Sequence, residues 1–255
     1  MNQSQHPSQQ HPGPALPPRA LTAQTLLLDA DDTLWENNIY FERAIASFIS
    51  YVNHRTFTPQ QVRQHLNRHE LATIRAHGYG LKSFRMSLVN CFEELVESPV
   101  TPQMHREIIS FTDAIAADEM ELISGVAETL HQLHARHTIW LVTKGNDAEQ
   151  RGKLQRSQLA HYFHGVEVLP EKNEAAYRDL VSRHGWDAAT TWMIGNSPKS
   201  DINPSLAAGL RAVFIPHAHT WIMEEAEICM QPDGKQLIEL GSFTQLAEIF
   251  GSVLI

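Results

Sequence analysis

An apolar run that stops abruptly at carboxylates, over residues 25–35, constrains the fold of this chain more than any other stretch. Three leucines (residues 26–28) are followed at once by Asp29 and Asp31. Such a run is typical of a buried parallel strand whose C-terminal end opens into a site. Two carboxylates this close repel each other unless a cation or a proton lies between them. Hard oxygen ligands with no His or Cys nearby favour Mg²⁺ over Zn²⁺, so the strand end predicts a magnesium site.

Composition places the chain among globular proteins and argues against several function classes. With 255 residues, 42% hydrophobic and 19% charged, it is long enough for one large domain or for a core that carries a smaller one. A net charge of −9 argues against a nucleic-acid partner, which would need clustered Lys and Arg. Cys91 and Cys229 imply no disulfide framework. No apolar run approaches the ~18 residues of a membrane span, and no signal-peptide pattern is present, so we expect a cytoplasmic protein without a membrane partner.

The first half of the chain divides into a polar tail, the first strand and a helical segment. Residues 1–22 are rich in Gln, Pro, Ser and His and have little to bury, which predicts a disordered tail. After the first strand the apolar residues recur at spacings of three and four, with helix caps at Thr58 and Thr101. The pattern predicts four helices, the last continuing to Ile115, in an all-helical domain over residues 38–116.

The rest of the chain alternates between strand and helix. Further strands are predicted over residues 138–142, 166–169, 191–194, 212–215 and 237–240, and helices over 126–133, 173–184, 204–210 and from 243. Another helix starts at Asn146, which we expect to form a capping box with Glu149. The alternation predicts an α/β fold, a parallel sheet with helices on both faces. Residues 23–37 and 117–255 would form this core domain.

Two of the later strands also end at residues that carry chemistry. The second strand ends at Thr143, Lys144 and Gly145, followed by a helix N-terminus, which together make a candidate anion site. Lys172 lies at the start of the helix after the third strand. The helix dipole disfavours a cation there, and a nearby anion would explain it. Taken singly, Thr143 is equally explained as part of a helix cap, and a solvated lysine is the commoner explanation of Lys172.

The fourth strand leads through Gly195 into Asn196 and, after four further residues, Asp201. The amide oxygen of Asn196 can bind a hard cation but brings no charge. All four strand ends, in this order, resemble the four motifs of the haloacid dehalogenase-like (HAD) hydrolase superfamily. The departures from that pattern are Asn196, where Asp is commoner, and Asp32, where Gly is usual.

The resemblance implies both a fold and a set of functional residues. The fold is a Rossmann-like core, and the helical insert matches the family's C1-type cap, which covers the site during the reaction. The implied catalytic and phosphate-binding residues are Asp29 as nucleophile, Asp31 as general acid and base, and Thr143, Lys172, Lys144 and Gly145 around the phosphoryl group. The implied Mg²⁺ ligands are Asp29, Asp31, Asn196 and Asp201.

The reaction implied by this resemblance is Mg²⁺-dependent hydrolysis of a small phosphorylated metabolite through an aspartyl-phosphate. Asp31 favours phosphoryl chemistry because the dehalogenase branch of the family lacks that second Asp. A phosphoglycolate-phosphatase-like role is one option. Two alternatives stay open. One is a non-catalytic or regulatory protein that binds a phosphorylated ligand, motivated by Asn196, and the other is a C–halogen hydrolase.

Other polar residues are weaker candidates. Residues near the helical domain that could face the site, although surface exposure explains each at least as well, are Glu36, Asn37, Arg43, residues 79–82 and Arg85. His217 and His219 follow a strand and could reach the cleft. His131, His134 and His137 lie on or just past a helix without a carboxylate motif, so we do not predict zinc there. The sequence does not indicate an oligomeric state.

Overall fold

The centre of the fold is a six-stranded parallel sheet with β1 (Thr25–Leu28) in its middle. A computed structural model describes residues 23–96, 98–116, 120–229 and 237–251; the predicted tail over residues 1–22 lies outside the described residues. The strand order is β3-β2-β1-β4-β5-β6, and all neighbouring strands are parallel. The other strands are β2 (Thr138–Lys144), β3 (Gly165–Leu169), β4 (Thr191–Gly195), β5 (Arg211–Phe214) and β6 (Leu237–Glu239).

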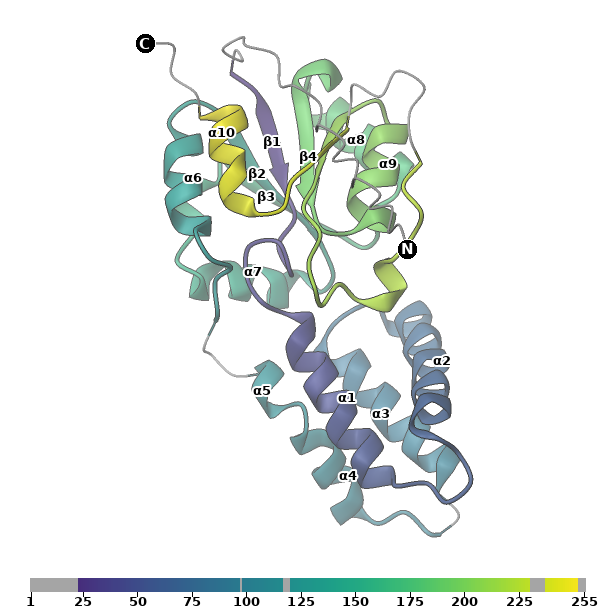
Figure 1. Cartoon of the computed structure of the whole chain (residues 1–255). Helices are drawn as coiled ribbons and strands as arrows, with labels where there is room; N and C mark the ends of the chain where they lie inside the picture. Colours follow the sequence, from purple (N-terminus) through teal and green to yellow (C-terminus); the bar gives the residue numbers. More distant parts are fainter. Residues whose placement is uncertain (1–22, 97, 117–119, 230–236, 252–255) are drawn as a thin grey trace, which may run out of the picture.

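The leucines of β1 alternate between the two faces of the sheet, which explains the continuous apolar run. Leu26 and Leu28 belong to one hydrophobic core, and Leu27 belongs to another together with Tyr177. Helices α6 and α10 lie on one side of the sheet and α8 and α9 on the other (Figure 1). The helices of the core are α6 (Val126–His134), α7 (Asp147–Arg156), α8 (Glu174–His184), α9 (Asn203–Ala207) and α10 (Leu246–Phe250). The predicted α/β fold, with a parallel sheet buried between helices, is confirmed.

The first five helices form a separate layer, here called the helical unit, beyond the carboxyl ends of the strands (Figure 1). They are α1 (Asn38–Val52), α2 (Pro59–His77), α3 (Leu81–Leu95), α4 (Pro102–Ser110) and α5 (Asp113–Ala116). The unit has a hydrophobic core of its own, in which Phe48, Leu66, Leu88 and Ile108 are fully buried. The helical unit therefore packs around a core whose residues differ from those of the cores beside the sheet.

Two short connections join the helical unit to the sheet, and they lie side by side. Glu36 N donates a hydrogen bond to Glu121 O (2.9 Å), and Ile123 N donates one to Leu34 O (3.0 Å). Trp35, which lies in the first connection, is fully buried. This pairing fixes the start of α1 relative to β1 and so holds the helical unit over the carboxyl edge of the sheet.

Most predicted elements occur close to their predicted bounds, and the fourth predicted helix is the main exception. The caps at Thr58 and Thr101 are confirmed, because each side chain accepts a hydrogen bond from the backbone N–H three residues later. The prediction of one helix reaching Ile115 is wrong. Helix α4 ends and α5 begins on either side of Thr112, whose hydroxyl donates to Ile109 O (2.7 Å). Such a local side-chain bond competes with continuation of the helix.

Two further predictions need correction. The helix predicted over residues 204–210 is the shorter α9, and Gly209 beyond its end takes a φ of 89°, which does not continue a helix. The capping box at the start of α7 is half present. Asn146 Oδ1 accepts from Glu149 N (3.1 Å), but the Glu149 carboxylate accepts from Leu81 N of the helical unit (3.1 and 3.2 Å). Glu149 therefore connects the core to the helical unit.

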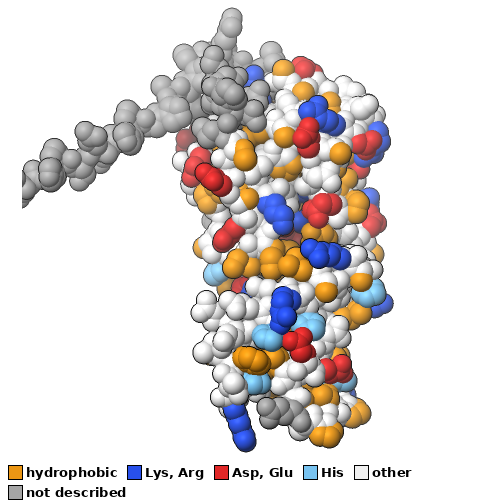
Figure 2. All heavy atoms as spheres, turned by 90° about the vertical axis from the view of Figure 1, so that its right-hand side faces the viewer, with side chains coloured by type: hydrophobic (Ala, Val, Ile, Leu, Met, Phe, Trp, Pro, Cys, Tyr) orange, Lys and Arg blue, Asp and Glu red, His pale blue; other side chains and the backbone are white. Residues whose placement is uncertain are grey.

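The face of the molecule in Figure 2 mixes side chains of both charges. Lys and Arg are interspersed with Asp and Glu over the core and over the helical unit, and the histidines on this face gather toward the helical unit. The described part of this face therefore presents no extended field of one sign. Among the described residues, no helix is both long enough and apolar enough to cross a membrane.

Candidate active site

A cavity of about 180 Å³ lies between the sheet and the helical unit. It is lined on the sheet side by all the residues that the sequence singled out for catalysis, phosphate binding or metal binding, namely Asp29, Asp31, Thr143, Lys144, Gly145, Lys172, Asn196 and Asp201. They come together because the carboxyl ends of parallel strands meet at one edge of the sheet. Helices α1, α2 and α3 form the opposite wall.

Lys172 is the centre of the site. Its Nζ donates to Asp29 Oδ1 (2.5 Å) and to Asp201 Oδ1 (2.8 Å), and all three side chains are buried. Burial opposes the charge of Lys172, but the two carboxylates outweigh it and raise the pKa of Lys172. Burial and the charge of Asp29 raise the pKa of Asp201 to about 7. Two carboxylates that share one ammonium leave the centre with unbalanced negative charge when both are ionised.

A tight turn after β4 positions Asp201. In the π-helical turn η3 (Pro198–Ile202) the chain winds back so that Asp201 Oδ2 accepts a hydrogen bond from Ser197 N (3.0 Å). Gly195 lies against this carboxylate, because a Cβ built on it would come within 2.2 Å of Asp201 Oδ2. Glycine is therefore required at the end of β4 for the backbone to approach so closely.

Thr33 and Asn196 extend the site from the second oxygen of Asp29. Thr33 Oγ1 lies 3.0 Å from Asp29 Oδ2 and 3.3 Å from Asn196 Oδ1. The side-chain nitrogen of Asn196 donates to Thr220 Oγ1 (3.0 Å), which turns its amide oxygen toward Thr33. Asn196 thus presents an oxygen to the same region as Asp29.

These oxygens fit a magnesium ion. Carboxylate and amide oxygens are hard donors of the kind that Mg²⁺ prefers. The unbalanced negative charge of Asp29 and Asp201 would be neutralised by a divalent cation. Among the described residues that line the cavity there is no His or Cys, the ligands that would favour zinc.

Asp31 lines the cavity, but three donors occupy its carboxylate. Lys153 Nζ lies 2.8 Å from both oxygens, Gln150 Nε2 donates to Oδ2 (2.9 Å), and Trp35 Nε1 donates to Oδ1 (2.7 Å). Burial alone would raise the pKa of Asp31, but Lys153, together with Gln150 and Trp35, lowers it. No hydrogen bond between described residues joins this carboxylate to Asp29. The side chain of Asp31 is therefore paired with donors of the protein itself.

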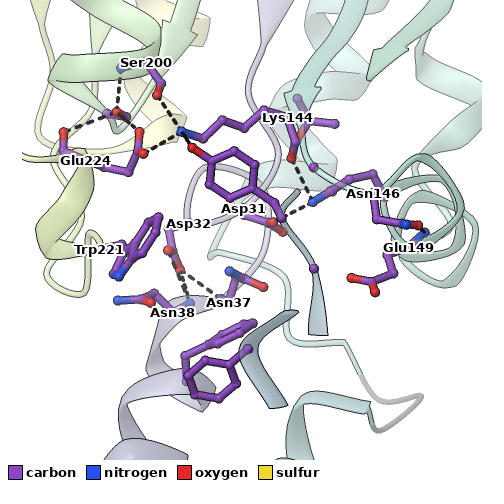
Figure 3. Close-up of a pocket in the computed structure, with 18 of the residues that line it drawn as sticks. Asp31, Asp32, Asn37, Asn38, Lys144, Asn146, Glu149, Ser200, Trp221 and Glu224 are labelled. Carbon is purple, nitrogen blue, oxygen red and sulfur yellow. Dashed lines mark hydrogen bonds and ion pairs between the residues drawn. The ribbon is translucent and has the colours of Figure 1, made fainter. Parts of the chain in front are cut away.

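Lys144 contacts an acidic partner that lies far away in the sequence. Its Nζ donates to Glu224 Oε1 (2.6 Å) and to Ser200 Oγ (2.9 Å), and it lies 4.7 Å from the centre of the Tyr79 ring (Figure 3). Burial disfavours the charge of Lys144, but Glu224, together with Tyr79 and Glu171, outweighs burial and raises the pKa of Lys144. Lys172, rather than Lys144, is the cation that contacts Asp29.

Asp32 stands where the family pattern usually has Gly, and its side chain has a structural role that explains the presence of Asp. Its φ of 60° lies in the left-handed region that favours glycine. Its Oδ1 accepts hydrogen bonds from Asn37 N (2.9 Å) and Asn38 N (3.0 Å) at the start of α1 (Figure 3). Burial raises the pKa of Asp32 to about 7. The side chain thus satisfies otherwise unpaired N–H groups at the helix start.

The weaker candidates divide into residues that line the cavity and residues that do not. Asn37, Tyr79 and Gly80 line it, whereas Glu36, Arg43, Leu81, Lys82, Arg85, His217 and His219 do not. Glu36 Oε1 and His217 Nε2 instead lie 3.3 Å apart. His137 is a buried core residue that accepts from Gln24 N (3.0 Å). His131 and His134 pack against the ring of Tyr162.

Sequence reasoning missed several residues of the cavity wall, among them Gln150, Lys153, Glu224 and Glu70. Gln150 and Lys153 are spaced by three on α7, a helix whose weak apolar pattern gave no reason to single them out. Glu224 lies in the segment after β5, without a local sequence signal. Glu70 did leave a signal, because it interrupts the apolar stripe of α2 with an apolar residue four positions away on either side.

Fold and site together define a class of protein. A carboxylate lies at the end of the central strand of a parallel sheet, in contact with a buried lysine, and carboxylates are among the groups that can act as nucleophiles. The family model of haloacid dehalogenase-like hydrolases matches residues 23–209. The chain therefore belongs to the haloacid dehalogenase-like hydrolase family, and the resemblance of its motifs is confirmed. No curated protein matches the sequence.

Solved structures share the architecture over most of the chain. A haloacid dehalogenase-like family hydrolase from Xanthomonas campestris is 26% identical, with a TM-score of 0.72 over 88% of this chain and 92% of that one. The Bacillus subtilis protein YfnB, solved bound to magnesium, is 17% identical (TM-score 0.61; 91% and 100% covered). A predicted phosphoglycolate phosphatase from Haemophilus somnus 129pt is 18% identical (TM-score 0.59; 89% and 97% covered). Structures of 2-haloacid dehalogenases also share the fold, at identities between 10% and 20%.

Proposed function

We propose that this hydrolase is a Mg²⁺-dependent phosphatase that acts on a small organic phosphomonoester through an aspartyl-phosphate on Asp29. The observation that carries the proposal is the contact of Lys172 with both Asp29 and Asp201 in a cavity that Asp31 also lines. A second carboxylate two residues after the nucleophile suits phosphoryl chemistry, which needs proton transfer to an alcohol and from a water. The cavity volume of about 180 Å³ suits a small substrate.

Hydrolases of this family generally use a divalent metal, and the residues present fit one. Asp29, Asn196 and Asp201 would hold Mg²⁺, since their oxygens lie around a centre with unbalanced negative charge. When bound, the ion would neutralise charge on the phosphate and so favour attack by a carboxylate. The side chain of Asp31, paired with Lys153, is not needed for this ligand set.

Each of these side chains has a separate role in the proposed reaction. A carboxylate oxygen of Asp29 attacks phosphorus, the bond from phosphorus to the alcohol oxygen breaks, and Lys172 and Thr143 stabilise the charge on the phosphoryl group. The pair of Asp31 and Lys153 gives a proton to the leaving alcohol and recovers one from the water that hydrolyses the aspartyl-phosphate. At rest the carboxylate of Asp31 is ionised, because Lys153, Gln150 and Trp35 hold its pKa below its usual value.

Asn196 motivates one alternative of a different kind, a non-catalytic protein that binds a phosphorylated ligand. An amide in place of a carboxylate removes one negative charge from the metal site and so weakens its attraction for Mg²⁺. A binding protein would keep the anion-binding residues, Lys172 and Thr143, and would show no turnover.

Release of phosphate from a panel of small phosphomonoesters, with Mg²⁺ or with EDTA, tests the proposal. We expect Mg²⁺-dependent turnover that the Asp29→Asn variant lacks. The Glu107→Gln variant is the control, since it changes an exposed carboxylate of α4 that does not line the cavity. Halide release from 2-haloacids in parallel tests the dehalogenase alternative, and turnover there without any phosphate release would refute the phosphatase proposal.

A further inference from the structure

The half of the cavity that the helical unit forms combines apolar side chains with a few polar ones, and one of the polar groups is a buried carboxyl. Phe41 and Ile45 of α1, Ile74 of α2 and Phe84 of α3 line this half. Glu70 of α2 also lines it and is only 5% exposed. Its Oε2 is buried and has no hydrogen-bond partner within the described residues. A buried acceptor without a partner is destabilising, so its place in a cavity wall indicates a ligand that supplies a donor.

Among the described residues, no cation takes this role. The charge of Arg63 lowers the pKa of Glu70 but does not offset the effect of burial, and the charge of Glu42 raises it further. Arg63 makes two bonds of 2.8 Å to Glu42 and a third of 2.8 Å to Asn67. The guanidinium of Arg63 is thus bonded to Glu42. The Glu70 carboxyl group, which lines the cavity, is left available to a ligand bound there.

The charges around the cavity are distributed unevenly between its two ends. Its three lysines, Lys144, Lys153 and Lys172, all lie on the sheet side, and each contacts a carboxylate of the protein. On the side formed by the helical unit, the described residues that line the cavity include no Lys, Arg or His. A negative group at this end of a substrate would meet Glu70 and no balancing cation, whereas a positive group would meet a carboxylate.

We propose that the substrate is a phosphomonoester whose organic part is apolar and ends in an amine, and that Glu70 binds this amine. The sheet end of the cavity takes the phosphoryl group, and the apolar side chains of α1, α2 and α3 take the carbon chain. This inference rests on the proposed phosphatase function for the phosphoryl end only.

An ammonium group suits Glu70 better than a neutral donor does. It brings three N–H donors and a positive charge to a carboxylate that is shielded from water, where such a pair is strongest. Burial raises the pKa of Glu70 to about 7, and Arg63 offsets this rise only in part. The small side chains of Ser83 and Ser87, both buried in the same wall, leave room for the end of such a substrate.

Calorimetric titration of the Mg²⁺-loaded protein with phosphonates tests the inference. The probes are ω-aminoalkylphosphonates, the matching alkylphosphonates and ω-carboxyalkylphosphonates, from ethyl to hexyl. Phosphonates cannot be hydrolysed in this way, so binding is measured whether or not the protein is a phosphatase. For the best-fitting length we expect the wild type to bind the amine about tenfold more tightly than the alkyl probe, because a charge-assisted bond is added.

Glu70→Gln provides the decisive comparison. Gln keeps the shape and one acceptor but lacks the charge, so the preference for the amine should disappear and the affinity for the carboxylate probe should rise. A variant that is merely misfolded would lose affinity for all three probes. The Glu107→Gln control should keep the wild-type preference.

Two results would overturn the inference. One is equal binding of amine and alkyl probes by the wild type at every length, and the other is a preference for the amine that Glu70→Gln retains. Phosphate release from the corresponding esters separates this inference from the proposed function. If the esters are hydrolysed but the binding preference for the amine does not depend on Glu70, only the proposal of amine binding is refuted. If the preference depends on Glu70 but no ester is hydrolysed, only the proposed phosphatase activity is refuted.

Discussion

Replacing Glu70 by Gln should also stabilise the protein at neutral and alkaline pH. Burial raises the pKa of Glu70 from its ordinary 4.5 to about 7; Arg63 opposes this rise and Glu42 adds to it. The folded protein therefore resists ionisation of Glu70 more than the unfolded chain does. At about 1.4 kcal/mol per pKa unit, the difference between 4.5 and about 7 corresponds to a penalty of up to about 3 kcal/mol on the free energy of unfolding.

The sign of the pH dependence follows from the two pKa values. Below pH 4.5 Glu70 is protonated in both states and carries no penalty. As the pH rises toward about 7, the unfolded chain has lost the proton and the folded protein still holds it, so the contribution of Glu70 to stability falls. Above about 7 the penalty is complete. Gln does not titrate, so the stability gained by the variant should grow with pH.

This gain is measured by urea denaturation at a series of pH values, with the circular dichroism signal of the helices as the readout of unfolding. The difference in free energy of unfolding between Glu70→Gln and the wild type should increase by up to about 3 kcal/mol from about pH 5 to about pH 8. Glu107→Gln removes the same charge from an exposed position of the helical unit, and its difference from the wild type should stay nearly constant. A pH-independent difference for Glu70→Gln, or one equal to the control, would refute the burial argument.

The remaining predictions concern the sheet side of the cavity. Asp29→Asn should lower phosphate release by about a thousandfold or more with an unchanged circular dichroism spectrum, because the nucleophile is lost; wild-type turnover would contradict its role. Lys153→Met should slow the hydrolysis of alkyl phosphates about ten- to a hundredfold. Hydrolysis of p-nitrophenyl phosphate should slow much less, because only an alkyl leaving group needs a proton on its oxygen. Equal losses on both esters would contradict the proton role of the pair with Asp31. Asn196→Asp should tighten Mg²⁺ binding about tenfold in calorimetry by adding a charge; unchanged affinity would show that Asn196 is not a ligand. A large gain in turnover in this variant would indicate that Asn196 had impaired the metal site. Little change in turnover would indicate that the site works with an amide at this position.

The sheet and the motif positions could be predicted because each depends on local pattern. The leucines before Asp29 mark a strand buried on both faces, and the alternation with helices makes the sheet parallel. In a parallel sheet the strand ends meet at one edge, so four local patterns are enough to bring Asp29, Thr143, Lys172 and Asp201 to one cavity. No knowledge of the exact packing is needed for this step.

The partners of the charged side chains could not be predicted in the same way. Lys153 and Asp31 are 122 residues apart in the sequence, and Lys144 and Glu224 are 80 apart. Their pairing depends on how α7 and the segment after β5 pack against the sheet, which no local pattern encodes. These contacts decide that Lys144 is balanced by Glu224.

The sequence by itself therefore determined the fold class, the family and the residues of the sheet side, because periodicity and strand ends are local properties. Only the tertiary structure decided which wall Glu70 faces and that its Oε2 has no hydrogen-bond partner among the described residues. In the sequence Glu70 is a single carboxyl group on the apolar stripe of α2. Whether such a group meets solvent, an arginine or a cavity depends on the packing of three helices over the sheet, and that packing is a property of the whole chain.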